Sequence, residues 1–156
     1  MFLRCGVAAI LTLILLAGCG SKMDPYQRQV NRALEATLQG QELRQEGELQ
    51  RATRAFQRSL RISQKIDDRA GVARDLNNLG AMALEEGKLA AAREFFHHAL
   101  TLNQELGQSR EAAINLANLA TVAQKTGDWP GAAAHLQAAR QAAAEAGDAQ
   151  LLAQIQ

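Results

Sequence analysis

The spacing of apolar residues from position 26 onward predicts helices along the rest of the chain. Leucine, alanine and phenylalanine recur three and four positions apart, with arginine, glutamate and glutamine between them, as in amphipathic helices. The sequence has no run of alternating β-branched residues that would argue for a strand. The predicted helices span residues 26–46, 48–67, 70–86, 88–106, 109–126, 129–146 and 148–156. We therefore predict an all-α fold that forms one domain.

The helical pattern repeats at a constant spacing along the chain. Gly47, Gly87 and Gly127 align at this spacing, and each opens a similar segment: GELQRA, GKLAAA and GDWPGA. Glycine suits a turn because it adopts positive φ at low cost where a helix ends. Asp128 and Pro130 suit the start of the helix that follows. Each unit is therefore predicted to be a pair of helices joined by a tight turn.

Small and large residues also recur at fixed offsets, and this arrangement resembles the tetratricopeptide repeat. The residues that carry the resemblance are Leu79, Gly80, Gly87, Ala92, Phe96 and Ala99, then Leu119, Ala120, Gly127, Ala132, Leu136 and Ala139. The usual repeat of this family is shorter than the spacing of the three glycines, so this chain should have longer helices or longer joins. The resemblance implies a short right-handed α-solenoid of three helix pairs plus a C-terminal helix. The repeats are expected at about 33–72, 73–112 and 113–147 within a domain that covers 26–156.

The last predicted helix, residues 148–156, has an apolar side formed by Leu151, Leu152 and Ile155. Solenoids usually need a capping element at each end to stay soluble. This helix is therefore expected either to cap the stack or to leave an edge that pairs with a second copy as a homodimer. The cap is the preferred interpretation.

The first residues have the layout of a bacterial export signal. Arg4 gives a positive start, residues 7–16 are apolar apart from Thr12, and small residues precede Cys19. An apolar core of about ten residues is too short for a transmembrane helix, which needs about 20 residues to cross roughly 30 Å of hydrocarbon. We therefore predict that residues 1–18 are a signal peptide that is removed.

The tetrad LAGC at residues 16–19 resembles the lipobox of bacterial lipoproteins. The resemblance implies cleavage between Gly18 and Cys19 and a diacylglyceryl group on the Cys19 thiol, with residues 19–25 as the lipidated cysteine and a short linker. Acyl chains such as palmitate would hold the protein firmly, since each buried CH₂ contributes about 0.8 kcal/mol. Gly20, where an aspartate would imply retention at the inner membrane, implies the inner leaflet of an outer membrane, facing the periplasm.

The sequence offers little catalytic or metal-binding chemistry. Cys5 leaves with the signal and Cys19 would be lipidated, so the mature chain keeps no thiol. Adjacent His97 and His98 point about 100° apart on a helix, and His135 stands alone. The serines have no histidine and acid partners at a recognisable spacing, and the glycines are single turn residues. We predict no enzymatic activity, no cofactor and no metal.

Asn78 and Asn118 recur at the repeat spacing on the first helices of their pairs. In tetratricopeptide proteins these helices line a concave groove, so the resemblance implies that the two asparagines contact a bound peptide. The alternative is that each asparagine is buried and joins neighbouring helices. The other groove positions implied are Thr37, Gln41 and Ile114, and these include no basic set for a peptide carboxylate.

A stripe of positive charge is the strongest signal that the repeat does not require. It runs for about 20 Å along the second helix of repeat one and consists of Arg51, Arg54, Arg58, Arg61 and Lys65. Residues 22–74 hold 11 basic and 7 acidic side chains, whereas residues 75–156 hold 5 and 9. The stripe is expected to meet anionic lipid headgroups or an acidic protein, or else to be a solvated face with carboxylates around it.

These patterns favour a non-catalytic, lipid-anchored adaptor that recruits another envelope protein or peptide through its solenoid surface. In this make-up the chain resembles lipoproteins that assist pilus assembly and adaptors that organise cell-wall hydrolases. The alternative is a structural lipoprotein that self-associates through its C-terminal edge. Nucleic acid is a poor candidate partner because an exported lipoprotein would not meet it.

Overall fold

The computed structural model describes residues 23–155, and this part of the chain contains seven helices and no strand. The helices are α2 (Pro25–Gln45), α3 (Leu49–Lys65), α4 (Arg69–Glu85), α5 (Leu89–Glu105), α6 (Ser109–Lys125), α7 (Trp129–Glu145) and α8 (Ala149–Gln154). The predicted all-α fold is confirmed. Each helix from α3 to α7 has 17 residues, so longer helices account for the long repeat period. No helix among the described residues is both long and apolar enough to cross a membrane.

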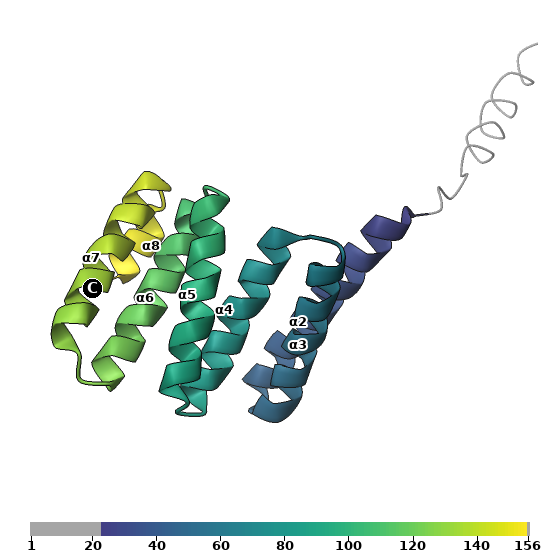
Figure 1. Ribbon diagram of the computed structural model, residues 1–156, viewed down its shortest axis with the longest axis horizontal. Helices are drawn as coiled ribbons and strands as arrows, with labels where there is room; N and C mark the ends of the chain where they lie inside the picture. Colours follow the sequence, from purple (N-terminus) through teal and green to yellow (C-terminus); the bar gives the residue numbers. More distant parts are fainter. Residues whose placement is uncertain (1–22, 156) are drawn as a thin grey trace, which may run out of the picture.

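The helices pack as three antiparallel pairs, α2 with α3, α4 with α5 and α6 with α7, and each pair stacks on the next. Figure 1 shows the pairs in one row, with α8 against α7 at the far end and the first turns of α2 extending beyond the row. The predicted helices are close to the observed ones, with ends that differ by at most two residues for the first six. The last helix is shorter than predicted, six residues instead of nine.

Positive backbone φ angles occur in the turns where the repeat predicts them. Gly47, Gly87 and Gly127 have φ between 73° and 79° and end the first helix of each pair. The turns between pairs use the same conformation at positions 67, 107 and 147, where glycine stands only at the last two. Asp67 has φ 55° and is the one non-glycine residue with positive φ in the described chain. The predicted helix start at Asp128 is confirmed, because its carboxylate accepts a hydrogen bond from the Gly131 amide at 2.9 Å.

We expect Asp67→Gly to raise the free energy of unfolding by about 0.5–1 kcal/mol, because glycine occupies the left-handed region without the strain of a Cβ. Gly107 and Gly147 already stand at the equivalent positions. Thermal denaturation measures the change. Asp67→Ala is the matched control, since it removes the same charge but keeps a Cβ. A stabilisation by both substitutions would show that charge, not backbone strain, limits this turn.

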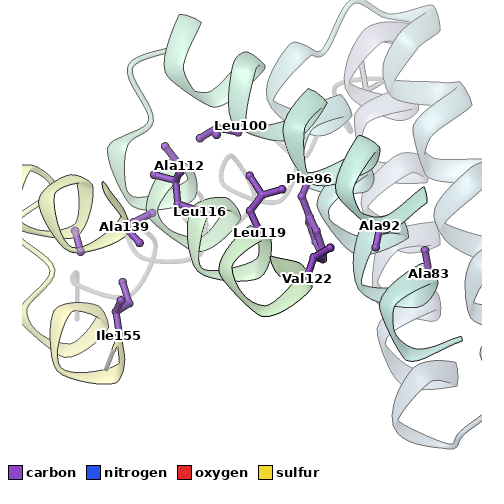
Figure 2. Packing of buried hydrophobic residues seen from close by; sticks show 12 residues of the cluster. Ala83, Ala92, Phe96, Leu100, Ala112, Leu116, Leu119, Val122, Ala139 and Ile155 are labelled. Atoms are coloured by element: carbon purple, nitrogen blue, oxygen red, sulfur yellow. The ribbon is translucent and has the colours of Figure 1, made fainter. Parts of the chain in front are cut away.

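Close helix packing in the core depends on glycine facing phenylalanine within a pair. A Cβ placed on Gly40 would lie 2.6 Å from the Phe56 ring, and one on Gly80 would lie 2.6 Å from the Phe96 ring. Both rings are buried, and Phe96 shares a cluster with side chains of α6, α7 and the C-terminal residues (Figure 2). The small and large positions identified in the sequence are therefore the places where helices meet.

The three junctions between successive elements differ in chemistry at one equivalent position. Asp75, Asn115 and Ile155 follow one another at the repeat spacing, and all three side chains are buried. Asp75 meets hydroxyl groups, Asn115 meets other asparagines, and Ile155 packs in the apolar cluster of the last junction. The equivalent position is therefore an acid in α4, an amide in α6 and an alkyl group just after α8, where Ile155 has left the helical conformation.

Candidate partner-binding surfaces

The first helices of the three pairs line a shared hollow, which we call the inner groove. Its lining includes Gln41 of α2, Arg74 and Asn77 of α4, and Arg110 and Ile114 of α6. A neighbouring hollow also uses Arg110 and Ile114 and continues past Asn118 to α8. The groove therefore runs across several repeats, where a tetratricopeptide solenoid would hold a peptide.

Two leucines of α2 stand at positions equivalent to residues on the groove side of α4. Leu34 aligns with Arg74 of the next repeat, and Leu38 aligns with Asn78. Their side chains are 45% and 55% exposed, although leucine is normally buried in a helical domain. By this alignment repeat one presents two exposed leucines, of which Leu38 also lines a hollow with Arg32 and Arg58 between α2 and α3.

Asn118 is engaged in a network of amides between helices. Its Nδ2 donates to Asn77 Oδ1 at 2.9 Å, and Asn115 Nδ2 donates to the same oxygen at 2.9 Å. Asn103 Nδ2 in turn donates to Asn115 Oδ1 at 2.6 Å. For Asn118 the structure therefore shows the alternative in which an asparagine joins neighbouring helices.

Asn78 differs from its repeat equivalent. Its Nδ2 atom is buried and has no hydrogen-bond partner among the described residues. A buried donor without a partner is costly, by about 1–3 kcal/mol. Asn78 therefore lacks the helix-joining contacts of Asn118, and its amide nitrogen is enclosed by the fold and not exposed in the groove.

Two arginines of the inner groove were missed by the sequence reasoning, and one predicted groove residue was wrong. Arg74 and Arg110 line the groove, and Arg110 Nε also donates to Asp148 Oδ2 at 2.8 Å. Thr37 is 1% exposed and lies in the core, because its helical position faces the next pair. Aligning Arg74 with Ile114 across one repeat would have identified the first arginine.

Asp75 is a fully buried carboxyl group next to the groove. It accepts hydrogen bonds from Ser59 at 2.7 Å, Thr37 at 3.0 Å and Ser63 at 3.2 Å. Burial raises the pKa of Asp75, and the hydroxyl donors and the Arg74 charge oppose this effect. Since the carboxyl has no exposed surface, it joins the first two pairs and does not act on a substrate.

The predicted stripe on α3 is exposed along its whole length. Arg51 pairs with Glu48 at 2.6 Å, which raises the pKa of the guanidinium. The other four members, Arg54, Arg58, Arg61 and Lys65, form no ion pair within residues 23–155.

The three histidines gather on α5 and α7 without forming a metal centre. The rings of His97 and His135 meet edge to face with centroids 6.3 Å apart. Burial lowers the pKa of His97, helped by His135, Arg93 and His98. Residues 23–155 contain no group of three or more side chains that would hold a metal ion.

The C-terminal apolar side chains mostly pack against the rest of the fold. Ile155 is 4% exposed and packs with Ala139 and Ala143, so it does not belong to an open edge. Leu151 is half-buried, and Leu152 is 36% exposed. Placing Ile155 on a self-association surface was wrong, because the chain turns its side chain back onto the last helix pair. The predicted lipidation and cleavage residues, Gly18 and Cys19, lie outside the described residues.

Comparisons with known proteins agree with this geometry. Residues 34–105 match the model of the tetratricopeptide repeat family. The fold is similar to the N-terminal domain of stress-induced protein-1 from C. elegans, with a TM-score of 0.62, 17% identity, and coverage of 81% of this chain and 94% of that one. No curated protein sequence matches significantly. The match and the fold indicate a protein-interaction module, since such repeats typically are non-catalytic scaffolds.

Proposed function

We propose that this protein is a non-catalytic adaptor of the bacterial envelope, which binds a segment of another envelope protein in its inner groove. The groove and the tetratricopeptide match at residues 34–105 support a protein-binding role. The observation that carries the proposal is the exposure of two leucines of repeat one, Leu34 and Leu38, of which Leu34 aligns with the groove residue Arg74. Neither leucine is covered by the described fold itself.

The groove chemistry defines the segment that it would hold. Leu34 and Leu38 offer contact to apolar side chains, and burial of one such side chain contributes about 1.5–3 kcal/mol. Arg74 lines the groove and offers donors for a carboxylate. The partner segment is therefore one with apolar residues at one end and acidic groups at the other.

The LAGC tetrad supports an anchor at the N-terminus. In this proposal the signal is cut between Gly18 and Cys19, and the lipid on Cys19 holds the protein in the inner leaflet of an outer membrane. The solenoid then faces the periplasm and positions its partner during assembly of an envelope complex. Pilus assembly and control of cell-wall hydrolases are two processes that use lipoproteins of this make-up.

Site-specific crosslinking in cells tests the groove. A photoreactive residue in place of Gln41, which lines the groove, should capture one envelope protein. We expect Leu34→Glu with Leu38→Glu to reduce that capture at least tenfold, because charged groups replace the apolar contact. Leu106→Glu is the matched control, since Leu106 is also exposed (37%) but lies at the end of α5. Equal capture by both variants would contradict binding in the groove.

A further inference from the structure

The ion pairs of the fold leave one group of cations unused. Three ion pairs link different helices: Arg44 with Glu85 joins the first two helix pairs, Arg69 with Glu105 lies within the second pair, and Arg110 with Asp148 joins α6 to the start of α8. Within residues 23–155, nine cations form no ion pair, and six of them lie on α2 and α3. We call these six the basic surface: Arg28, Arg32, Arg54, Arg58, Arg61 and Lys65.

The basic surface extends from α3 around the outer edge of repeat one. Arg32 of α2 and Arg58 of α3 line the same hollow, together with Ile62. Because α2 and α3 are antiparallel, the end of α3 at Lys65 lies beside the first half of α2. Glu35 and Glu42 line the same hollow, and Glu48 and Glu86 line a second hollow with Arg54. The sequence stripe is thus one part of a wider positive area at the start of the domain.

We propose that the basic surface lies on the anionic phospholipid headgroups of the membrane that carries the anchor. This inference rests on the proposed lipidation of Cys19, which lies shortly before Pro25 in the sequence. A chain spans at most about 3.5 Å per residue, so α2 begins within about 20 Å of the bilayer. The cations nearest the start of α2 are therefore held at the membrane.

The surroundings of the stripe favour lipid over an acidic protein. Interfaces between proteins are built around buried aromatic and apolar anchors. The exposed neighbours of the stripe on α3 are the glutamines Gln50, Gln57 and Gln64, and the hollow that Arg32 and Arg58 line contains Leu38 and Ile62 but no aromatic side chain. Met23 and Tyr26 are about half exposed at the start of α2, and tyrosine is enriched at the membrane interface.

The distribution of charge along the domain determines how the solenoid is oriented relative to the membrane. Residues 22–74 carry a net charge near +4 and residues 75–156 one near −4, by the side-chain counts above. An anionic membrane attracts the first part and repels the second. The outer edge of repeat one therefore faces the lipid, and α7 and α8 point away from it. This orientation leaves the inner groove open to a partner in the periplasm.

Vesicle binding tests the inference without the lipid anchor. The mature chain with Cys19→Ser is mixed with vesicles of phosphatidylcholine, with or without phosphatidylglycerol, and binding is measured by sedimentation. We expect binding only with phosphatidylglycerol and a strong decrease with added salt. Arg58→Glu, Arg61→Glu and Lys65→Glu together should weaken binding about 100-fold. The control variant replaces three other unpaired cations, Arg93, Lys125 and Arg140, with glutamate. Its affinity for the vesicles should stay within about threefold of that of the unchanged chain.

The outcomes of these experiments distinguish phospholipid headgroups from an acidic protein as the partner of the basic surface. Absence of binding to phosphatidylglycerol, or equal losses in the two triple variants, would overturn the inference. A photoreactive residue at Gln57 that captures a protein in cells, without vesicle binding, would assign the surface to an acidic protein instead. Because the tested chain lacks the Cys19 thiol, failure of lipidation in cells does not affect this result. Circular dichroism of all variants confirms that they are folded.

Discussion

Phe96→Ala is expected to lower the free energy of unfolding by about 3–5 kcal/mol, as for large aromatic deletions in close-packed cores. The ring is 0% exposed and fills the space that Gly80 leaves on the facing helix. Stabilities of small domains are about 5–15 kcal/mol, so this loss is a large part of the total. Urea denaturation followed by circular dichroism measures it. A loss below about 1 kcal/mol would contradict the packing described here.

An exchange between repeats is the control for this prediction. The third repeat places Ala120 and Leu136 where the second has Gly80 and Phe96. Gly80→Ala alone should destabilise by overpacking, because its Cβ would lie 2.6 Å from the Phe96 ring. Gly80→Ala combined with Phe96→Leu should recover most of that loss. If the two effects simply add, the glycine and the ring do not share one space.

Asp75→Ala is expected to lower the free energy of unfolding by about 2–3 kcal/mol, because it removes an acceptor that three buried hydroxyl groups share and leaves Thr37 and Ser59 with the Ala33 carbonyl alone. Asp75→Asn keeps an acceptor and should cost less at neutral pH, as Asn115 stands at the equivalent position. Chemical denaturation at several pH values compares the variants with the unchanged chain. A loss with Asp75→Asn as large as that with Asp75→Ala would contradict this assignment.

The pH dependence follows from the raised pKa of Asp75. Burial favours the protonated carboxyl, so Asp75 keeps its proton to a higher pH in the folded chain than in the unfolded chain. In the unfolded chain the pKa of this carboxyl is near 3.8. The unfolded state releases its proton first as pH rises, so Asp75 lowers stability between the unfolded and the folded pKa and at all higher pH. Relative to Asp75→Asn, the unchanged chain should therefore lose stability as pH rises from about 4. An increase in its relative stability over this range would show that hydrogen bonding, not burial, dominates at Asp75.

Much of the architecture follows from the sequence because local chemistry specifies it. Gly47, Gly87 and Gly127 mark turns whose positive φ only glycine adopts without strain, so the helix pairs could be counted from the chain alone. Gly80 and Phe96 showed where backbones approach closely. The remaining error is at the last described helix, which ends at Gln154 because Ile155 leaves the helical conformation and packs into the core.

The candidate sites were harder to predict because they depend on which helix face meets the neighbouring pair. Thr37 and Leu38 are adjacent in sequence, yet one is buried and the other is exposed. Asn78 and Asn118 share a repeat position, but only the second finds a partner, because Asn77 lies within its reach. Ile155 belongs to an apolar segment that was expected to form an exposed edge, but its side chain is buried within its own chain. A repeat alignment gives the position of a residue on its helix, whereas the packing of the neighbouring helix pair determines whether its side chain is exposed.

The intact mass of the protein purified from bacterial membranes tests the central claim most directly. We expect a mass that lacks residues 1–18 and includes lipid on Cys19, and we expect Cys19→Ser to prevent both changes. A chain that retains its first residues and carries no lipid would contradict the proposed anchor and, with it, the adaptor role at the envelope.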